Sequence, residues 1–410
     1  MYFLQTKDER KCSLNHSAIG RKFSRTPLAL RMLSALLLAA VPQAHGQSES
    51  VLHSFTNSPD GATPSFVTPV LDTKGTLYGT TNYGGAYGYG TVFEVTSSGT
   101  EKILHSFNVN GKDGFYPEAG LVRDAKGNLY GTTAEGGPDT IYGTVFKLTP
   151  TKRGWTETIL HSFGASGDGS QPTAVPALDK AGNLYCTTFY GGASNFGTVF
   201  EVTSSGTEKV LWSFGTGADG ANPLAGVILD TNRNIYGTTE YGGVYGKGTV
   251  FELTSSGTEK ILWNFGGGAD GAYPFAGVIL SKGILYGATS AGGSYNSGTV
   301  YQVTLSGTET ILHSFENNDL DGVTPYSGLV IDTSGNLYGT TLAGGGSGGV
   351  AGIVFEITLS GTYIILHNFG ATGDGANPWG GMVFDRSGNL WGTTPFGGAN
   401  ELGTVFTVTP

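Results

Sequence analysis

The sequence contains few of the residues on which common catalytic and metal sites depend. Two of its 410 residues are cysteines; Cys12 lies in a basic leader segment, which leaves Cys186 alone in the rest of the chain. The chain without its leader can therefore form no internal disulfide and offers no zinc site built from cysteine and histidine. Cys186 takes the place of a repeated glycine, which indicates a small residue filling a buried position.

Histidine is also scarce, with seven residues in the chain. The five that follow the leader share one position of a repeated segment, and two other copies place tryptophan there. These residues are His53, His105, His161, His313 and His367, with Trp212 and Trp263. A position that accepts either ring selects a flat amphipathic side chain, not a proton shuttle or a metal ligand. No histidine is then free for a Ser-His-Asp triad, and we predict no catalytic residue.

Residues 1–46 differ in composition from the rest of the chain. They carry seven lysines or arginines against two acids, followed by an apolar run over residues 32–41 and small residues at 44–46. This order predicts a secretory signal peptide over residues 1–46. Ten apolar residues are too few to span a bilayer, so we expect no membrane span after the segment is removed. The protein is then expected to be secreted or at the cell surface, in an extracellular or periplasmic location.

Without the leader the chain carries 15 basic and 30 acidic residues. Such an acidic surface disfavours polyanions, so nucleic acid is not expected as a partner. The Gly-x-Gly strings lie between strand-like runs, and no helix follows them to bind a nucleotide phosphate. We therefore predict no cofactor. Whether the chain binds a metal ion is left open by the sequence.

The chain repeats one segment seven times. Its core is Leu-Tyr-Gly-Thr-Thr or a close variant, and its aromatic residue recurs every 50 to 55 residues. The aromatic positions are Tyr78, Tyr130, Tyr185, Tyr236, Tyr286, Tyr338 and Trp391. A period near 50 residues marks a repeat architecture, in which one unit cannot bury its faces alone.

Each unit holds four strand-like runs separated by turn signals. In the second unit these runs are 120–124, 129–133, 143–149 and 158–163. Both faces of the runs are apolar, as expected for sheets that pack against a neighbour on each side. Seven such units predict an all-β protein, a seven-bladed β-propeller of four-stranded antiparallel blades over residues 47–410. Small pairs such as Ala119-Gly120 open the first strand, where strands would crowd a central axis.

The two ends of the repeat region complement each other. The region begins with residues 51–55, which match a fourth strand alone, and ends with residues 403–410, which match a third strand without its fourth. The four strand types are equal in number only if the two ends share a blade. We therefore predict that an N-terminal strand completes the last blade and closes the ring.

Several short motifs recur through residues 51–410, namely Leu-Tyr-Gly-Thr-Thr, Gly-Gly, Gly-Thr-Val-Phe, Ser-Gly-Thr-Glu and Asp-Gly-x-x-Pro. This set resembles the GloVer-type tandem repeats of bacterial choice-of-anchor proteins. The resemblance implies a secreted or cell-surface bacterial protein. It implies no reaction.

Two loops of each unit are expected to meet on one face of the ring. One loop joins the second and third strands and carries Gly-Gly; the other leads into the next unit and carries Asp-Gly-x-x-Pro. Its aspartates are Asp60, Asp113, Asp168, Asp219, Asp270, Asp321 and Asp374. We interpret them as turn-forming residues, since Asp-Gly is common turn chemistry. The alternative is that seven carboxylates around one mouth hold a cation or bind sugar hydroxyls.

A second set of aspartates ends the first strand of six units and precedes Gly-Asn-type turns. These are Asp72, Asp124, Asp179, Asp230, Asp332 and Asp385. We interpret them as turn formers on the opposite face.

The residue before Gly-Gly differs around the ring. It is aromatic or acidic in five units, at Tyr83, Glu135, Tyr190, Tyr241 and Phe396, and alanine in the other two. The other loop adds Tyr116, Glu118, Tyr273, Phe275, Tyr326 and Trp379. Exposed rings among carboxylates suit sugars, which present an apolar face and hydroxyl edges. The predicted ligand-binding set is Tyr83, Glu135, Tyr190, Tyr241, Phe396, Tyr116, Glu118 and Trp379. The alternative is that these rings pack over neighbouring loops.

The first functional hypothesis is therefore an extracellular, monomeric protein that binds a carbohydrate without catalysis. A second hypothesis is a glycan hydrolase or lyase, in which Glu118 and Glu135 approach each other as an acid and base pair. A third is a structural or adhesive module that binds a surface protein through the rim of the disc.

Overall fold

The computed structural model describes residues 49–138, 141–215, 217–266, 269–316, 318, 320–346 and 350–410. The predicted signal peptide over residues 1–46 lies outside these ranges. Within the described ranges every regular element is a β-strand, and no helix is long and apolar enough to cross a membrane.

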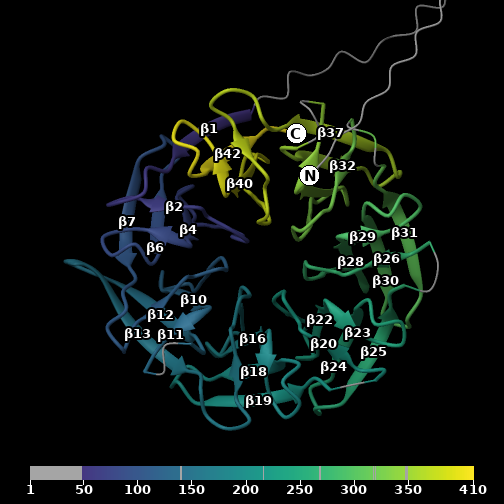
Figure 1. The fold of residues 1–410 in the computed structure, drawn as a ribbon, viewed down its shortest axis with the longest axis horizontal. Helices are drawn as coiled ribbons and strands as arrows, with labels where there is room; N and C mark the ends of the chain where they lie inside the picture. The colour runs from purple at the N-terminus through teal and green to yellow at the C-terminus, as the bar shows by residue number, and fades with distance from the viewer. Residues whose placement is uncertain are drawn as a thin grey trace, which may run out of the picture. The chain divides into compact units, whose positions relative to one another are not determined.

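Seven four-stranded antiparallel sheets form a ring, which confirms the predicted seven-bladed β-propeller (Figure 1). Blade 1 consists of β3 (Val70–Leu71), β4 (Leu77–Thr81), β6 (Thr91–Val95) and β7 (Glu101–Ser106). Blade 2 consists of β9 (Val122–Arg123), β10 (Leu129–Thr133), β12 (Thr144–Thr151) and β13 (Gly154–Ser162). Blade 3 consists of β15 (Ala177–Leu178), β16 (Leu184–Thr188), β18 (Thr198–Val202) and β19 (Glu208–Ser213). Blade 4 consists of β21 (Ile228–Leu229), β22 (Ile235–Thr239), β24 (Thr249–Leu253) and β25 (Glu259–Asn264). Blade 5 consists of β27 (Ile279–Ser281), β28 (Ile284–Thr289), β30 (Thr299–Thr304) and β31 (Glu309–Ser314). Blade 6 consists of β33 (Val330–Ile331), β34 (Leu337–Thr341), β36 (Ile353–Ile357) and β37 (Tyr363–Asn368). Blade 7 consists of β39 (Val383–Phe384), β40 (Leu390–Thr394), β42 (Thr404–Val408) and β1 (Glu49–Ser54).

The ring closes through blade 7, as the ends of the repeat region predicted. β1 pairs with β42 in the order β1-β42-β40-β39, so the first described strand is the outer strand of the last blade. His53 lies opposite Val405, and a bulge follows Val51. His105 lies opposite Val92 with the same bulge in blade 1. The closing strand therefore has the register of an outer strand that is continuous with its blade.

Aromatic and aliphatic side chains fill the space between adjacent blades. Phe55 of blade 7 packs edge-on against Phe93 of blade 1, with ring centroids 5.1 Å apart, and both rings are fully buried. Gly79 lies opposite Phe93, and a Cβ there would meet the Phe93 ring at 2.7 Å. The glycine of the Leu-Tyr-Gly-Thr-Thr core therefore makes room for the aromatic ring of the next strand. Cys186, which replaces this glycine in blade 3, is fully buried.

The inner strands crowd the axis where the small residue pairs were noticed. A Cβ added at Gly226 would collide with the backbone carbonyl oxygen of Val175 in the preceding blade. Gly120 has the same relation to Thr68. Small residues at these positions therefore let neighbouring inner strands approach each other closely.

The aspartates that end the first strands form turns, as predicted. The Asp72 Oδ1 accepts backbone hydrogen bonds from Lys74 and Thr76 at 2.8 and 3.0 Å. The same pattern recurs at Asp124 and Asp179.

Candidate functional site at the channel mouth

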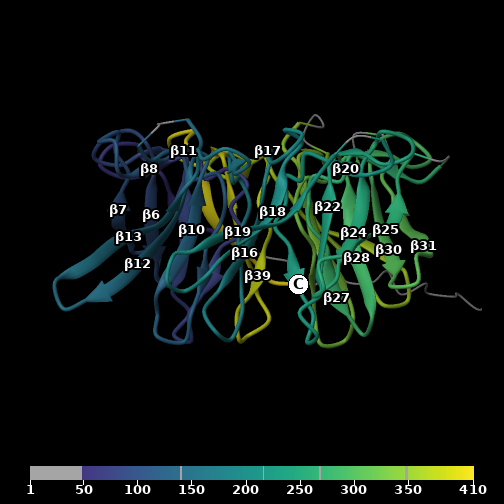
Figure 2. The same cartoon turned by 90° about the horizontal axis from the view of Figure 1, so that it is seen from below.

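The two variable loops of each blade lie on one face of the ring, as predicted, because a two-stranded sheet joins them (Figure 2). In blade 1 the pair is β2 (Gly61–Ala62) with β5 (Tyr83–Gly84). The other pairs are β8 (Gly114–Phe115) with β11 (Glu135–Gly136), β14 (Gly169–Ser170) with β17 (Tyr190–Gly191), β20 (Gly220–Ala221) with β23 (Tyr241–Gly242), β26 (Gly271–Ala272) with β29 (Ala291–Gly292), β32 (Gly322–Val323) with β35 (Ala343–Gly344), and β38 (Gly375–Ala376) with β41 (Phe396–Gly397).

A cavity of about 400 Å³ lies on the axis and is lined by residues of all seven blades. Small residues such as Ala276-Gly277 and Ser327-Gly328 form its wall. Larger side chains come from the residue that follows each Asp-Gly-x-x-Pro proline, where the chain leaves the loop face and enters the inner strand. These are Glu118, Thr173, Leu224, Phe275, Tyr326 and Trp379, joined by Phe66 of blade 1. We call these seven residues the collar.

Aromatic rings make up one side of the collar. Phe275 and Tyr326 stack with centroids 4.4 Å apart and an angle of 27° between their planes. Phe66 and Trp379 lie 5.1 Å apart at 34°. The collar therefore offers two flat ring pairs at the edge of a cavity large enough for a small ligand.

Two polar atoms of the collar lack partners. In the described part of the chain, the indole Nε1 of Trp379 and the Oγ1 of Thr173 are buried without a hydrogen bond. Native proteins satisfy nearly all buried polar groups, so unpartnered donors in a cavity wall point to a ligand or water there. Both side chains line the axial cavity.

Acidic groups near the cavity have raised pKa values. Burial, and then the charge of Glu135, raises the pKa of the Glu118 carboxyl. Glu240, which is 5% exposed, also has a raised pKa because it is buried, although a hydrogen bond with Tyr241 opposes the shift. The pKa of Tyr326 is raised by burial and then by the charge of Glu240. The cavity mouth is thus bordered by carboxyl groups that hold protons more readily than usual.

Of the eight residues in the predicted binding set, Glu118 and Trp379 line the cavity. Phe396 lies edge-on to Trp379, with ring centroids 5.7 Å apart, and continues the collar outward. The proposed acid and base, Glu118 and Glu135, are close enough for their charges to interact, but no hydrogen bond joins them within the described structure.

The remaining aromatic residues of the predicted set lie farther out on the loop face. Tyr83 contacts Tyr116 and Tyr241 contacts Tyr273, each edge-on at 5.4 and 5.7 Å between ring centroids. Tyr190 packs in the same way against Phe189. Tyr83, Tyr190 and Tyr241 remain 50%, 41% and 42% exposed. Tyr83 and Tyr241 therefore pack on neighbouring loops, Tyr190 packs on the adjacent residue of its own loop, and all three still present a face to solvent.

Sequence patterns missed part of the collar. The repeat pattern did not identify Phe66, because blade 1 has one more residue between Asp60 and Asp72 than blade 2 has between Asp113 and Asp124. Phe66 therefore does not directly follow the proline, as the other collar residues do. Thr173 is not aromatic, and only its unpartnered hydroxyl marks it. Phe275 and Tyr326 were recognised as loop residues, but their stacking across blades 5 and 6 appears only in three dimensions. No sequence pattern identified Glu240 as a residue near the cavity.

The Asp-Gly aspartates form turns, as predicted, and they face the outer strands instead of the mouth. Asp60 accepts hydrogen bonds from the backbone N–H groups of Thr56 and Gly61 at 2.9 and 2.7 Å. Its Oδ2 also lies 3.1 Å from the Nε2 of His53 on β1. The histidine position thus serves to pair with this aspartate, a relation that the sequence analysis did not find.

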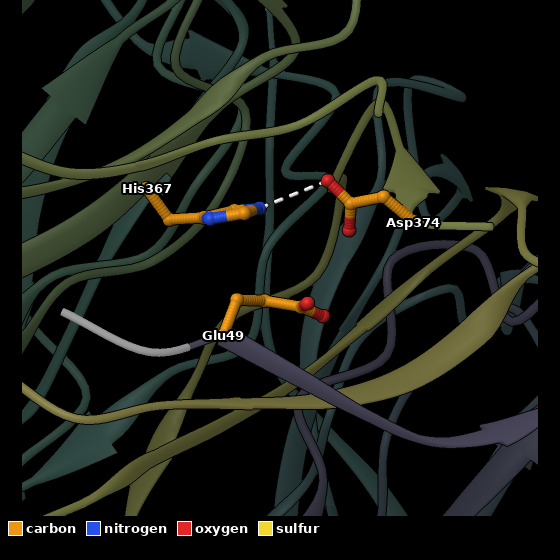
Figure 3. Close-up of side chains that lie close together, drawn as sticks. All are labelled: Glu49, His367 and Asp374. Carbon is orange, nitrogen blue, oxygen red and sulfur yellow. Dashed lines mark hydrogen bonds and ion pairs between the residues drawn. The ribbon is translucent and has the colours of Figure 1, made fainter. Parts of the chain in front are cut away.

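A side chain from the next blade lies near each of these aspartates, including the two whose outer strand carries tryptophan; Trp263 donates to Asp270, whereas the Nε1 of Trp212 forms no hydrogen bond among the described residues. Figure 3 shows the group at blades 6 and 7, where Glu49 of β1 lies beside His367 and Asp374. We call each such set of three a rim triad. The others are His53–Asp60–Glu101, His105–Asp113–Glu157, His161–Asp168–Glu208, Trp212–Asp219–Glu259, Trp263–Asp270–Glu309 and His313–Asp321–Tyr363.

Fold and site together define a seven-bladed β-propeller with a ligand-sized cavity at the loop-face end of its axis. A family model describes the repeats themselves. The Gloeobacter/Verrucomicrobia repeat matches residues 42–175, 140–351 and 289–410. The chain belongs to this family, which confirms the resemblance recognised in the repeat motifs.

Solved structures share the fold at low sequence identity. An ancestral GH74 enzyme superposes with a TM-score of 0.57 and 11% identity, over 85% of this chain and 48% of that one. An extracellular domain from B. thetaiotaomicron has a TM-score of 0.54 and 10% identity, over 86% of this chain and 39% of that one. The chain thus spans less than half of either protein, and these similarities establish the fold alone. No curated protein is significantly similar to the chain in sequence.

Proposed function

We propose that this protein binds a carbohydrate at the channel mouth and does not transform it. The observation that carries the proposal is the collar, in which stacked aromatic rings adjoin buried polar atoms without partners. A sugar ring places its apolar face on an aromatic ring and directs hydroxyl groups to donors and acceptors at its edge. The Trp379 N–H would donate to such a hydroxyl, and the Thr173 hydroxyl can donate or accept.

The dimensions of the site limit the ligand. A cavity of about 400 Å³ is at the small end of ligand pockets, so it suits one or two sugar units. A longer chain would extend outward over Phe396, which is 41% exposed, and along the exposed rings of the loop face. The proposed ligand is therefore a glycan whose end enters the cavity.

The proposed location is outside the cytoplasm, which rests on the predicted signal peptide at residues 1–46. A single monomeric ring would suffice for binding, because all seven blades of one chain form the cavity.

A glycan array with purified residues 47–410 tests the proposal. We expect binding to a defined set of glycans, followed by a measurable affinity for the best of them in calorimetry. A well-folded sample that binds none of the glycans would contradict the proposal.

A glycan-active enzyme remains the second candidate because two carboxyl groups near the cavity, Glu118 and Glu240, have raised pKa values. A general acid must hold its proton near neutral pH, and burial shifts the pKa of both carboxyl groups in that direction. If the glycan bound on the array is cleaved, Glu118→Gln or Glu240→Gln should abolish turnover and leave binding in place. Turnover that survives both substitutions would exclude these residues as the acid.

A further inference from the structure

The rim triads contain buried carboxylate oxygens that the fold leaves without partners. In the described structure, Oε1 of the glutamate is buried and accepts no hydrogen bond in all six triads that contain one. Burial of a charged oxygen without a partner is costly, and six equivalent cases indicate a shared cause. The triad of His105, Asp113 and Glu157, between β7 of blade 1 and β13 of blade 2, leaves two carboxylate oxygens, Oδ1 of Asp113 and Oε1 of Glu157, without a hydrogen bond in the described structure.

Asp113 differs from the other six aspartates of the triads. In those six, both carboxylate oxygens accept hydrogen bonds or face a donor; Oδ1 of Asp374, for example, accepts the Gly375 N–H at 2.7 Å. Oδ1 of Asp113 is buried and accepts no hydrogen bond within the residues described. The Asp113 side chain is 3% exposed. A second carboxylate oxygen of this triad therefore lacks a partner.

The three ligand atoms lie within 4.8 Å of one another, and two of their separations are close to those in a metal coordination shell. Oδ2 of Asp113 also accepts hydrogen bonds from the backbone N and Nδ2 of Asn108 at 3.1 and 3.0 Å. The Nε2 of His105 lies 3.3 Å from Oδ2 of Asp113 and 3.5 Å from Oε1 of Glu157. Ligand atoms bonded to tetrahedral zinc at about 2.0–2.1 Å are separated by about 3.3–3.4 Å. We propose that His105, Asp113 and Glu157 bind a divalent transition-metal ion such as Zn²⁺ at the interface of blades 1 and 2.

Charge and ligand type favour such an ion. Two carboxylates and a neutral imidazole carry a charge of about −2, which a divalent cation neutralises, and imidazole with carboxylate suits zinc and its neighbours. Calcium would need six to eight oxygen ligands and does not favour imidazole.

An ion can reach this position from solvent. His105 and Glu157 are 20% and 16% exposed at their side chains, so the triad opens at the rim. The bound ion would join the outer strands of two adjacent blades and stabilise the folded ring by an amount that rises with the logarithm of the free metal concentration above its Kd.

Two similar triads are expected to bind less tightly. In the triad of Figure 3, His367 and Asp374 are 2.9 Å apart, the length of an ordinary hydrogen bond, and Asp374 is fully satisfied. The His161 triad has the same satisfied aspartate, since Oδ1 of Asp168 accepts the Gly169 N–H. An experiment must therefore compare variants and cannot rely on the total metal content.

His105→Trp is the test variant, because the fold already accepts tryptophan at this position in Trp212 and Trp263. His313→Trp is the matched control, since Tyr363 replaces the glutamate of that triad. Chelator-treated samples are dialysed against ZnCl₂ at pH 8 and their zinc is counted. We expect His105→Trp to hold about one Zn²⁺ per chain less than both the wild type and the control.

A second variant and a second metal protect the test against misfolding. Glu157→Gln keeps the size of the side chain and should also lower the zinc content, with an unchanged circular dichroism spectrum. Co²⁺ should give visible absorption bands of a four-coordinate site that are reduced in His105→Trp but not in His313→Trp. Equal zinc content in His105→Trp, Glu157→Gln and His313→Trp would overturn the proposal.

Discussion

The hydroxyl of Tyr363 donates a hydrogen bond of 2.6 Å to Oδ1 of Asp321 in the loop that joins blades 5 and 6. Its ring also stacks on His313 with centroids 3.9 Å apart. The other six rim triads place a glutamate where Tyr363 stands, and that glutamate has a buried oxygen without a partner in the described structure. The neutral Tyr363 hydroxyl thus gives the aspartate a hydrogen-bond donor, whereas an ionised glutamate at the same position cannot donate. We therefore expect the stability of the ring to depend on the protonation of these glutamates, and so on pH.

Glu259 and Glu309 should make the protein less stable as the pH rises. They belong to the two tryptophan triads, where no histidine is present. Burial, followed by the charge of Asp219 or Asp270 respectively, raises each pKa from 4.5 to about 7. Between these values the folded state binds more protons than the unfolded state, so the free energy of unfolding falls as pH rises from about 4.5 to 7.

Glu259→Gln and Glu309→Gln remove this dependence. Both variants should melt at a higher temperature than the wild type at pH 8, while the difference should shrink or reverse at pH 5. Melting in the presence of a chelator keeps metal binding out of the comparison. Glu401→Gln, at an exposed position, is the control and should leave the profile unchanged. A wild-type advantage at pH 8 would contradict the explanation.

Closure through β1 should be required for a soluble ring. A chain that begins at Asn57 lacks β1 and the fully buried Phe55, and it exposes the edge of β42. Unpaired strand edges promote aggregation. We expect this chain to elute as aggregates in size-exclusion chromatography and to melt earlier than a chain that begins at residue 47. A monomer with an unchanged melting temperature would show that closure is dispensable.

Close contact at the axis should make Gly226 intolerant of a side chain. A Cβ there collides with the Val175 carbonyl, whereas Gly328, at the same position of blade 6, has no atom within 4 Å. We expect Gly226→Ala to destabilise the protein by about 1–3 kcal/mol, as other overpacked sites do. Gly328→Ala should leave the stability nearly unchanged in the same denaturant titration. Equal effects of the two substitutions would contradict the difference in packing.

The indole N–H of Trp379 should contribute to ligand affinity. Trp379→Phe keeps an aromatic ring and removes the unpartnered donor. Loss of one hydrogen bond should weaken the affinity for the glycan found on the array by about tenfold, which corresponds to about 1.4 kcal/mol. Tyr295→Ala, at a residue 53% exposed that does not line the cavity, is the control in calorimetry. An unchanged affinity in Trp379→Phe would show that the indole N–H does not bind the glycan.

The fold could be predicted because the same pattern of strands and turns occurs seven times in the sequence. Each copy shows the same strands and turns, and residues 51–55 supply the strand that residues 403–410 need. The turn aspartates, such as Asp72, were predictable for the same reason, since their hydrogen bonds are local. The loop face was also predictable, because strand order alone places both variable loops at one end of every blade.

Contacts between blades decided the rest. Sequence alone established that His105 occupies a position for a flat ring, but Glu157 approaches it from an outer strand about 50 residues away. The collar likewise combines Phe66 and Trp379 from opposite ends of the chain. Repetition determines the blade, because each copy encodes its own strands and turns. The chemistry at the axis and the rim is decided by the tertiary structure, because ring closure places side chains from different repeats within contact distance.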